Sequence, residues 1–134
     1  MGKELKIKSF IKNSYDAYLY SKNNMAHLTQ EYFSAIYLAI NNEVICERII
    51  NVGTINQTVA SPKDVISWGL KFGAYAVIVL HNHPSGDPTP SKADYSFTLK
   101  VNEACNAVDF KFVDHIIIGK NNYYSFKEKR IIYE

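Results

Sequence analysis

The first half of the chain shows two different spacings of hydrophobic residues. Between residues 7 and 22, large apolar side chains recur every three or four positions and predict an amphipathic helix. Those side chains are Ile7, Ile11, Tyr15, Tyr18 and Leu19. Residues 31–40 (EYFSAIYLAI) and 43–53 (EVICERIINVG) are instead rich in aromatic and β-branched residues. The Asn41-Asn42 pair between them is typical of a tight turn, so these two segments predict an antiparallel hairpin.

A helix is predicted to begin at the sequence SPKD, residues 61–64. Ser61 is a favourable N-cap, Pro62 suits the first helical position, and Asp64 follows the cap by three residues. We expect the buried side of this helix to consist of Val65, Ile66, Trp68, Leu70 and Phe72. Gly73 is well placed to end the helix.

The second half of the chain alternates strand-like and helix-like segments. Residues 74–80 (AYAVIVL) are apolar without alternation, which predicts a central strand covered on both faces. A second helix is expected to begin at Ser91, with its apolar face formed by Phe97, Val101, Ala104, Cys105 and Val108. Residues 113–119 (VDHIIIG) and 123–126 (YYSF) predict a further strand hairpin. This order of elements predicts one α/β domain with helices layered on a mixed sheet.

Composition narrows the class of protein. A length of 134 residues suits one domain with its own core. No apolar run approaches the ~20 residues that cross a bilayer, and no apolar segment follows the basic start MGKELKIKSF, so we expect a cytoplasmic protein without membrane contact. Cys46 and Cys105 have apolar neighbours and no nearby partner cysteine, so both are expected to be reduced core residues.

The charge distribution gives little support for nucleic-acid binding. The net charge is +2, and the densest basic run, KEKR at 127–130, is interrupted by a glutamate. A DNA-binding domain usually carries a stronger basic patch, so nucleic acid stays an open but weakly supported partner. Apolar residues at the predicted sheet edges leave a homodimer as a further alternative.

The strongest candidate for chemistry lies where the apolar strand ends. His81 and His83 are two residues apart, so both imidazoles should point to the same side of the strand. Asp94 falls on the inward face of the helix that follows, and three of the four prolines of the chain restrict the loop between them. Two imidazoles and one carboxylate suit zinc and leave a fourth position open. The alternative is that Asp94 completes a capping box with Ser91, which requires no metal.

These residues form a recognisable pattern. His81-x-His83, seven residues, Ser91, two residues and Asp94 match the His-x-His-x7-Ser-x2-Asp motif of the JAMM (MPN+) metalloproteases. The string HNHPSGDPTPSKAD, with DHIIIG at 114–119 and YYSF, resembles the RadC-like branch of that superfamily. The resemblance implies a JAMM/MPN-type α-β-α sandwich over residues 29–134, preceded by an N-terminal helical segment at residues 1–28. It also implies that zinc is bound by the two histidines and the aspartate.

The resemblance further implies a catalytic glutamate upstream. The family's Gln-Glu-hydrophobic-aromatic strand start matches Gln30 to Phe33, which makes Glu31 the candidate general base. Glu43 and Glu47 are competitors, but they are expected at a hairpin turn and on an exposed strand face. Ser91 is the candidate donor to the developing oxyanion. Its hydroxyl is also a good N-cap, and we expect the two roles to compete.

The leading hypothesis is therefore a zinc-dependent hydrolase that cleaves a peptide or isopeptide bond in a protein or peptide substrate. The alternatives are a DNA-repair-associated DNA-binding module or metal-dependent nuclease, and a non-catalytic interaction scaffold. His115 either orients a metal ligand or is a hydrogen-bonded core histidine, and the second role is favoured. Asn82 stands where deubiquitinating members carry Ser or Thr, which leaves the substrate open.

Overall fold

A five-stranded mixed sheet forms the centre of the molecule. The computed structural model describes residues 7–53 and 61–132. The strands are β1 Tyr32–Leu38, β2 Val44–Val52, β3 Ala76–Asn82, β4 Lys111–Ile118 and β5 Tyr123–Ser125. Their order across the sheet is β2-β1-β3-β4-β5. Only the β3–β4 pair is parallel, since a helix connects these strands, and the three other pairs are antiparallel.

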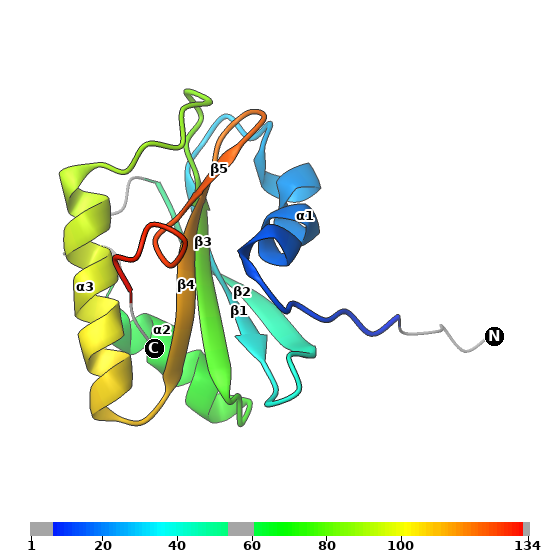
Figure 1. The fold of residues 1–134 in the computed structure, drawn as a ribbon, viewed down its shortest axis with the longest axis vertical. Coiled ribbons are helices and arrows are strands. Elements are labelled where there is room, and N and C mark those ends of the chain that lie inside the picture. The colour runs from blue at the N-terminus through cyan, green and yellow to red at the C-terminus, as the bar shows by residue number, and fades with distance from the viewer. Residues whose placement is uncertain (1–6, 54–60, 133–134) are drawn as a thin grey trace.

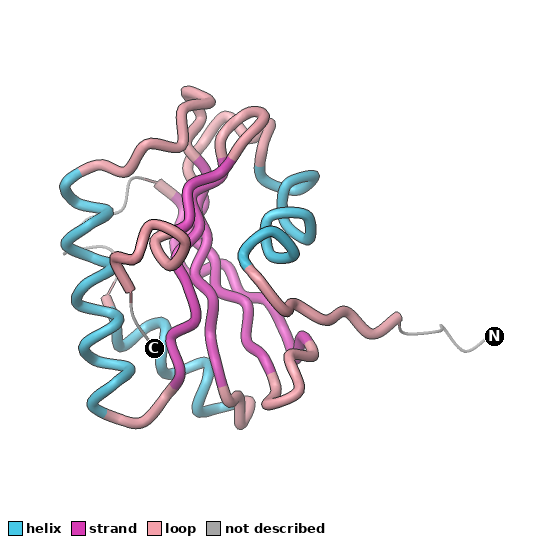
Figure 2. Tube along the Cα trace, in the orientation of Figure 1, coloured by secondary structure: helices cyan, strands magenta, loops and turns pink. Residues whose placement is uncertain are grey.

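Helices cover both faces of this sheet (Figure 1). The helix α1, Ser14–Met25, packs on one face, while α2, Pro62–Lys71, and α3, Lys92–Ala107, pack on the other. The same three layers are visible in the trace coloured by secondary structure (Figure 2). Every residue of β3 is buried, because the strand lies in the middle of both the sheet and the sandwich. The expected α-β-α sandwich around a mixed sheet is therefore confirmed.

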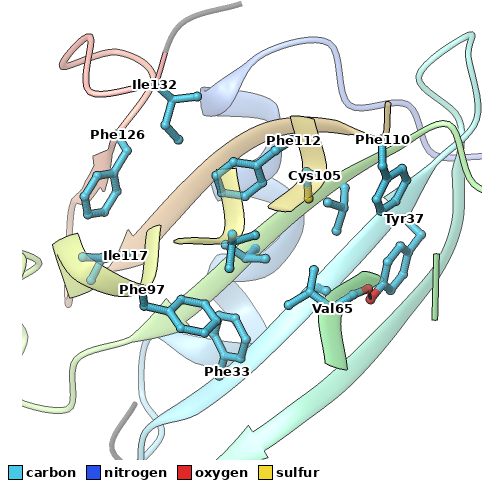
Figure 3. Packing of buried hydrophobic residues seen from close by; sticks show 14 residues of the cluster. Phe33, Tyr37, Val65, Phe97, Cys105, Phe110, Phe112, Ile117, Phe126 and Ile132 are labelled. Carbon is cyan, nitrogen blue, oxygen red and sulfur yellow. Dashed lines mark hydrogen bonds between the residues drawn. The ribbon is translucent and has the colours of Figure 1, made fainter. Parts of the chain in front are cut away.

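The two faces of the sheet have separate hydrophobic cores. The core beneath α2 and α3 is rich in aromatic rings, and Phe33 of β1 contacts Phe97 of α3 edge-on at a centroid distance of 5.0 Å (Figure 3). The core beneath α1 is mainly aliphatic and includes Ile36, Leu80 and Ile116. Burial of side chains of this size contributes about 1.5–3 kcal/mol each. These contacts fix α3 against β3 and β4, which sets the position of the residues at its first turn.

The expected N-terminal helix over residues 7–22 is wrong in its bounds. The helix begins at Ser14, because the Asn13 side chain caps it by accepting a hydrogen bond from the Asp16 backbone at 2.8 Å. Ile11 donates its backbone N–H to the turn between β1 and β2 instead of to a helix. Ile7, at the predicted start, is 89% exposed. The helical spacing of these apolar residues did not reveal that Ser9 and Ile11 form backbone hydrogen bonds with the β1–β2 hairpin.

The other predicted elements are confirmed, with corrections to their buried faces. The α2 helix begins after Ser61 with a capping box, and Gly73 follows its end at a φ of 64°. Leu70 is 69% exposed, however, so its predicted burial is wrong. Val108, predicted on the apolar face of α3, is 55% exposed because it lies beyond the last helical residue. Both cysteines are free; Cys105 is a core residue as expected, whereas Cys46 is only partly buried against the core.

Among the described residues, no helix is both long enough and apolar enough to cross a lipid bilayer.

Candidate metal centre

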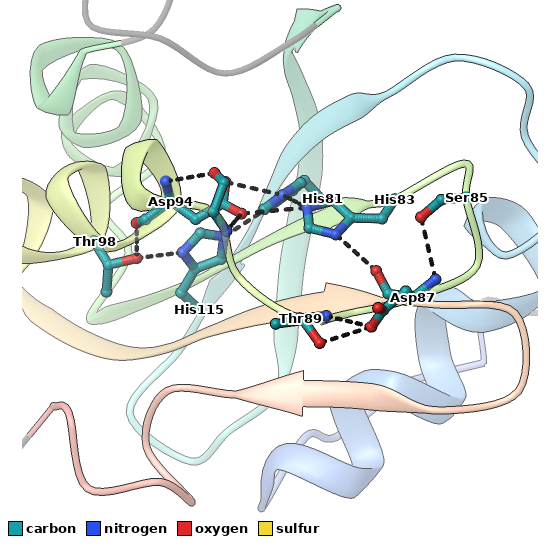
Figure 4. Close-up of polar contacts among 9 residues, drawn as sticks. His81, His83, Ser85, Asp87, Thr89, Asp94, Thr98 and His115 are labelled. Carbon is teal, nitrogen blue, oxygen red and sulfur yellow. Dashed lines mark hydrogen bonds and ion pairs between the residues drawn. The ribbon is translucent and has the colours of Figure 1, made fainter.

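His81, His83 and Asp94 converge at the carboxyl end of β3 (Figure 4). His81 is the penultimate residue of β3, and the backbone N–H of His83 bonds to Ile118 of β4 at 3.0 Å, which continues the strand ladder. The two imidazoles therefore share one side, and their Nε2 atoms lie 3.0 Å apart. Asp94 Oδ1 lies 3.3 Å from His81 Nε2, and Oδ2 lies 3.2 Å from His83 Nε2. These three side chains could hold a metal ion.

The charge of the Asp94 carboxylate is stabilised by its surroundings. Burial by itself raises its pKa, but the contacts from His81 and His83, together with the backbone of Ser91, bring the pKa far below the usual range. The hydrogen bond to Asp94 raises the pKa of His83, and the backbone oxygen of Asp87 acts in the same direction. Asp94 is therefore an anion at neutral pH, which is the form that binds metal.

Asp94 also completes the capping box of α3. Its Oδ2 accepts from the Ser91 N–H at 2.7 Å, and its own N–H donates to Ser91 Oγ at 3.1 Å. The other carboxylate oxygen, Oδ1, is turned to His81, so the cap and the approach to the histidines coexist. In this cap the Ser91 hydroxyl acts only as an acceptor. The capping role expected of Ser91 is confirmed, and its oxyanion role stays a prediction that the cap leaves a free hydroxyl proton to serve.

The proline-containing loop, residues 84–90, holds His83 in place. The ring nitrogen Nδ1 of His83 lies 2.9 Å from the backbone oxygen of Asp87, so this nitrogen donates and Nε2 is left facing the site. The loop in turn packs on the β4–β5 turn, where the Lys120 N–H donates to the Gly86 oxygen at 2.9 Å. An added Cβ at Gly119 would lie 2.5 Å from that same oxygen. Only glycine fits this close approach.

His115 of β4 contacts Nδ1 of His81, the ring nitrogen that does not face His83 and Asp94. Its Nε2 lies 2.8 Å from His81 Nδ1, and its Nδ1 lies 2.5 Å from the Thr98 hydroxyl (Figure 4). Burial lowers its pKa well below the usual value. The favoured prediction of a buried, hydrogen-bonded core histidine is confirmed, and the alternative, that His115 orients a metal ligand, stays a prediction, although its hydrogen-bond partner is the candidate ligand His81. Sequence reasoning missed Thr98, although a polar residue one turn after Asp94 on a buried helix face was a usable signal.

The segment that carries Glu31 is bound by Asn82, the residue between the two histidines. The Asn82 amide donates to the Gln30 oxygen at 2.9 Å and accepts from the Tyr32 N–H at 2.7 Å. These bonds hold the backbone on both sides of Glu31. The β1–β3 register pairs Phe33 with His81, which brings Glu31 toward the end of β3. Its negative charge is accordingly one of the influences that raise the pKa of His83.

The competing glutamates lie elsewhere. Glu43 forms a backbone bridge with Phe10 beside the β1–β2 turn. Glu47 pairs with Ile36, whose side chain is in the core beneath α1, on the face of the sheet opposite Phe33. The prediction of an exposed position for Glu47 is wrong: the side chain is partly buried, and this burial raises its pKa. Neither residue is placed beside His81.

Known proteins resemble this chain over most of its length. Residues 11–131 match the model of the RadC-like JAB domain. A UPF0758 protein of Carboxydothermus hydrogenoformans is 44% identical over 119 residues, which cover 89% of this chain and 53% of the relative. A UPF0758 protein of Haemophilus ducreyi is 38% identical over 130 residues, or 97% of this chain and 58% of the relative. The chain thus spans about half the length of these curated relatives.

Proposed function

Because the chain belongs to the RadC-like JAB domain family, we propose that it is a zinc-dependent hydrolase that cleaves a peptide or isopeptide bond. The observation that carries the proposal is the convergence of three side chains at the end of a central strand. One ligand atom from each of His81, His83 and Asp94 lies within 4.8 Å of the other two. The carboxyl ends of such strands are where α/β sheets usually bind ligands. The substrate and any partner of the whole protein are part of the proposal, since this chain covers only half of its relatives.

The donor set fits a catalytic zinc site. Two imidazole nitrogens and one carboxylate oxygen leave the fourth tetrahedral position open, whereas structural zinc sites are closed by four ligands, commonly thiolates. Cys105 is buried in the core beneath α3, and Cys46 lies on β2 against the same core. Neither thiol belongs to the candidate ligand group. A zinc ion held there would lower the pKa of a bound water to about 7 and polarise the scissile carbonyl.

We assign the proton transfers to Glu31. Its carboxylate would accept a proton from the attacking water and then pass it to the leaving amine. The Asn82 amide supports this role, because it holds the backbone of Gln30 and Tyr32 on either side of the glutamate. A general base must be held within hydrogen-bonding reach of the proton that it removes, and two backbone bonds restrict the segment strongly.

Ser91 would stabilise the negative charge that develops on the substrate oxygen. Its hydroxyl accepts the Asp94 N–H in the cap, so its own proton can be donated. The side chain is exposed at the start of α3, next to the candidate ligands. A donor of this kind strengthens its bond as charge builds, and therefore contributes mainly in the transition state.

The test begins with metal analysis of the purified protein, alongside a His81→Ala/His83→Ala variant. About one zinc per chain in the wild type and none in the variant is the expected result. A peptide and isopeptide library then supplies an assay for Glu31→Gln, which should lower kcat by ~10²–10⁴-fold at unchanged zinc content. Glu43→Gln is the matched control and should retain activity. A wild type that binds no zinc, or a Glu31→Gln variant as active as Glu43→Gln, would contradict the proposal.

A further inference from the structure

We propose that His115 and Thr98 are positioning residues that fix the tautomer and the ring orientation of His81. They form a directional relay of hydrogen bonds that begins at His81 and returns to the backbone of Asp94 (Figure 4). The inference rests on the proposed function, because it requires His81 to bind the metal. It goes further by naming the residues that determine which nitrogen of His81 is available.

The first link follows from the orientation of His81. Its Nε2 is turned to His83 and Asp94, at 3.0 and 3.3 Å, so Nε2 is the nitrogen that would bind a metal. A neutral imidazole carries one proton, and when Nε2 gives its lone pair that proton resides on Nδ1. His81 Nδ1 lies 2.8 Å from His115 Nε2. The His81 ring therefore donates, and His115 Nε2 must accept.

The donor and acceptor of each remaining hydrogen bond then follow. Because His115 Nε2 accepts the bond from His81, it carries no proton, and the proton of the His115 ring resides on Nδ1. That nitrogen donates to Thr98 Oγ1 at 2.5 Å. The Thr98 hydroxyl then donates its own proton to the backbone oxygen of Asp94 at 2.7 Å. Every donor in the chain has one acceptor, and the relay connects two candidate ligands through residues that bind no metal themselves.

A purely structural role explains less of this geometry. A threonine hydroxyl often bonds to the carbonyl four residues earlier in a helix, which accounts for the Thr98–Asp94 bond alone. It does not account for the His115 ring, which comes from β4 and is held between the rings of Phe126 and Phe33. Phe126 stacks on His115 at a centroid distance of 4.9 Å and an angle of 12°, and Phe33 contacts it edge-on at 6.4 Å. The ring is thus fixed with one nitrogen toward each neighbour.

The tautomers can be measured directly on the wild-type protein. Long-range ¹H–¹⁵N correlation of ¹⁵N-histidine-labelled, zinc-loaded protein distinguishes Nδ1–H from Nε2–H rings. We expect both His81 and His115 to carry their proton on Nδ1, although free neutral histidine favours Nε2–H. A zinc-loaded protein in which His115 carries its proton on Nε2 would overturn the relay and leave the zinc site itself intact.

Matched variants give a second readout, the zinc affinity measured by competition with a chromophoric chelator. His115→Phe keeps an aromatic ring but no acceptor, and Thr98→Val keeps the shape but no hydroxyl. Each should weaken zinc binding by roughly 10–100-fold. His115→Gln and Thr98→Ser restore an acceptor and a hydroxyl, and should recover most of the lost affinity.

The outcomes separate the two proposals. Zinc affinities of His115→Phe and Thr98→Val within threefold of a wild type that binds zinc would overturn the relay alone. A wild type that binds no zinc would overturn the proposed function, and the relay with it. If His115→Phe does not fold, as judged by circular dichroism, the Thr98 pair and the wild-type tautomers still decide the question.

Discussion

Replacing Asp94 by asparagine should separate its two roles. Asp94 Oδ2 accepts the Ser91 N–H at 2.7 Å, and the asparagine side-chain oxygen can accept the same bond. Asp94 stands at position N3 of α3 and not at the N-cap, so Asp94→Asn can keep this bond but removes the negative charge at the helix N-terminus, and the free energy of unfolding of the zinc-free protein should fall by about 0.3–1 kcal/mol. What Asp94→Asn removes is the anionic oxygen that faces the histidines.

The expected loss of zinc affinity follows from the number of ligands. Structural zinc sites bind with about 10–16 kcal/mol over four protein ligands, or about 2.5–4 kcal/mol per ligand. Loss of one ligand of the three should therefore weaken zinc binding by roughly 70- to 900-fold. An unpaired amide next to the buried imidazole of His81 and the partly buried imidazole of His83 gives no compensating contact. Asp94→Asn should thus be folded but deficient in zinc.

Ser91→Ala is the matched variant, and we expect it to lower stability while zinc binding is retained. It removes the oxygen that accepts the Asp94 N–H but keeps the Ser91 backbone N–H that holds the carboxylate. Loss of an N-cap costs about 1 kcal/mol, which for a domain of this size lowers Tm by about 3–5 °C. Zinc binding should be nearly unchanged. Chelator competition and thermal unfolding without zinc measure the two quantities. The reasoning is refuted if Asp94→Asn binds zinc within threefold of wild type, or if Ser91→Ala loses as much affinity as Asp94→Asn.

Two further predictions concern the packing around the site and the buried thiol. Gly119→Ala would place a Cβ 2.5 Å from the Gly86 oxygen and 2.8 Å from Pro88 Cδ, so the loop before α3 must shift. We expect destabilisation by about 1–3 kcal/mol in chemical unfolding, together with weaker zinc binding, and wild-type values for both would contradict this packing. Burial raises the pKa of Cys105 to about 11. Because the folded-state pKa is above that of the unfolded chain, the stability contribution of the neutral thiol is present below pH ~8.5 and is lost as the pH rises toward 11. Alkylation followed by mass spectrometry at pH 8 should find Cys105 slower to react than the partly exposed Cys46, and equal rates would count against this burial.

Much of the fold was readable because its signals are local. The capped start of α2 and the apolar run of β3 each depend on a few neighbouring residues. The asparagine turn is similarly local, and Asn42 has the positive φ of 72° expected for it. The failures occurred where distant segments decided. The chain before α1 pairs with the β1–β2 turn and is not helical. The helical spacing of its apolar residues could not predict this pairing, because the partner residues are distant in the sequence.

The candidate site divides in the same way. The sequence alone determined that His81 and His83 share a side of a strand and that Asp94 lies in the first turn of a helix, because strand alternation and capping are properties of neighbouring residues. Only the tertiary structure decided what surrounds them. Thr98 meets His115 because α3 packs across β4, and Asn82 reaches the segment before β1 because β1 lies beside β3. Contacts of this kind depend on strand order and on the packing of layers, which join residues far apart in the chain and have no period in the sequence.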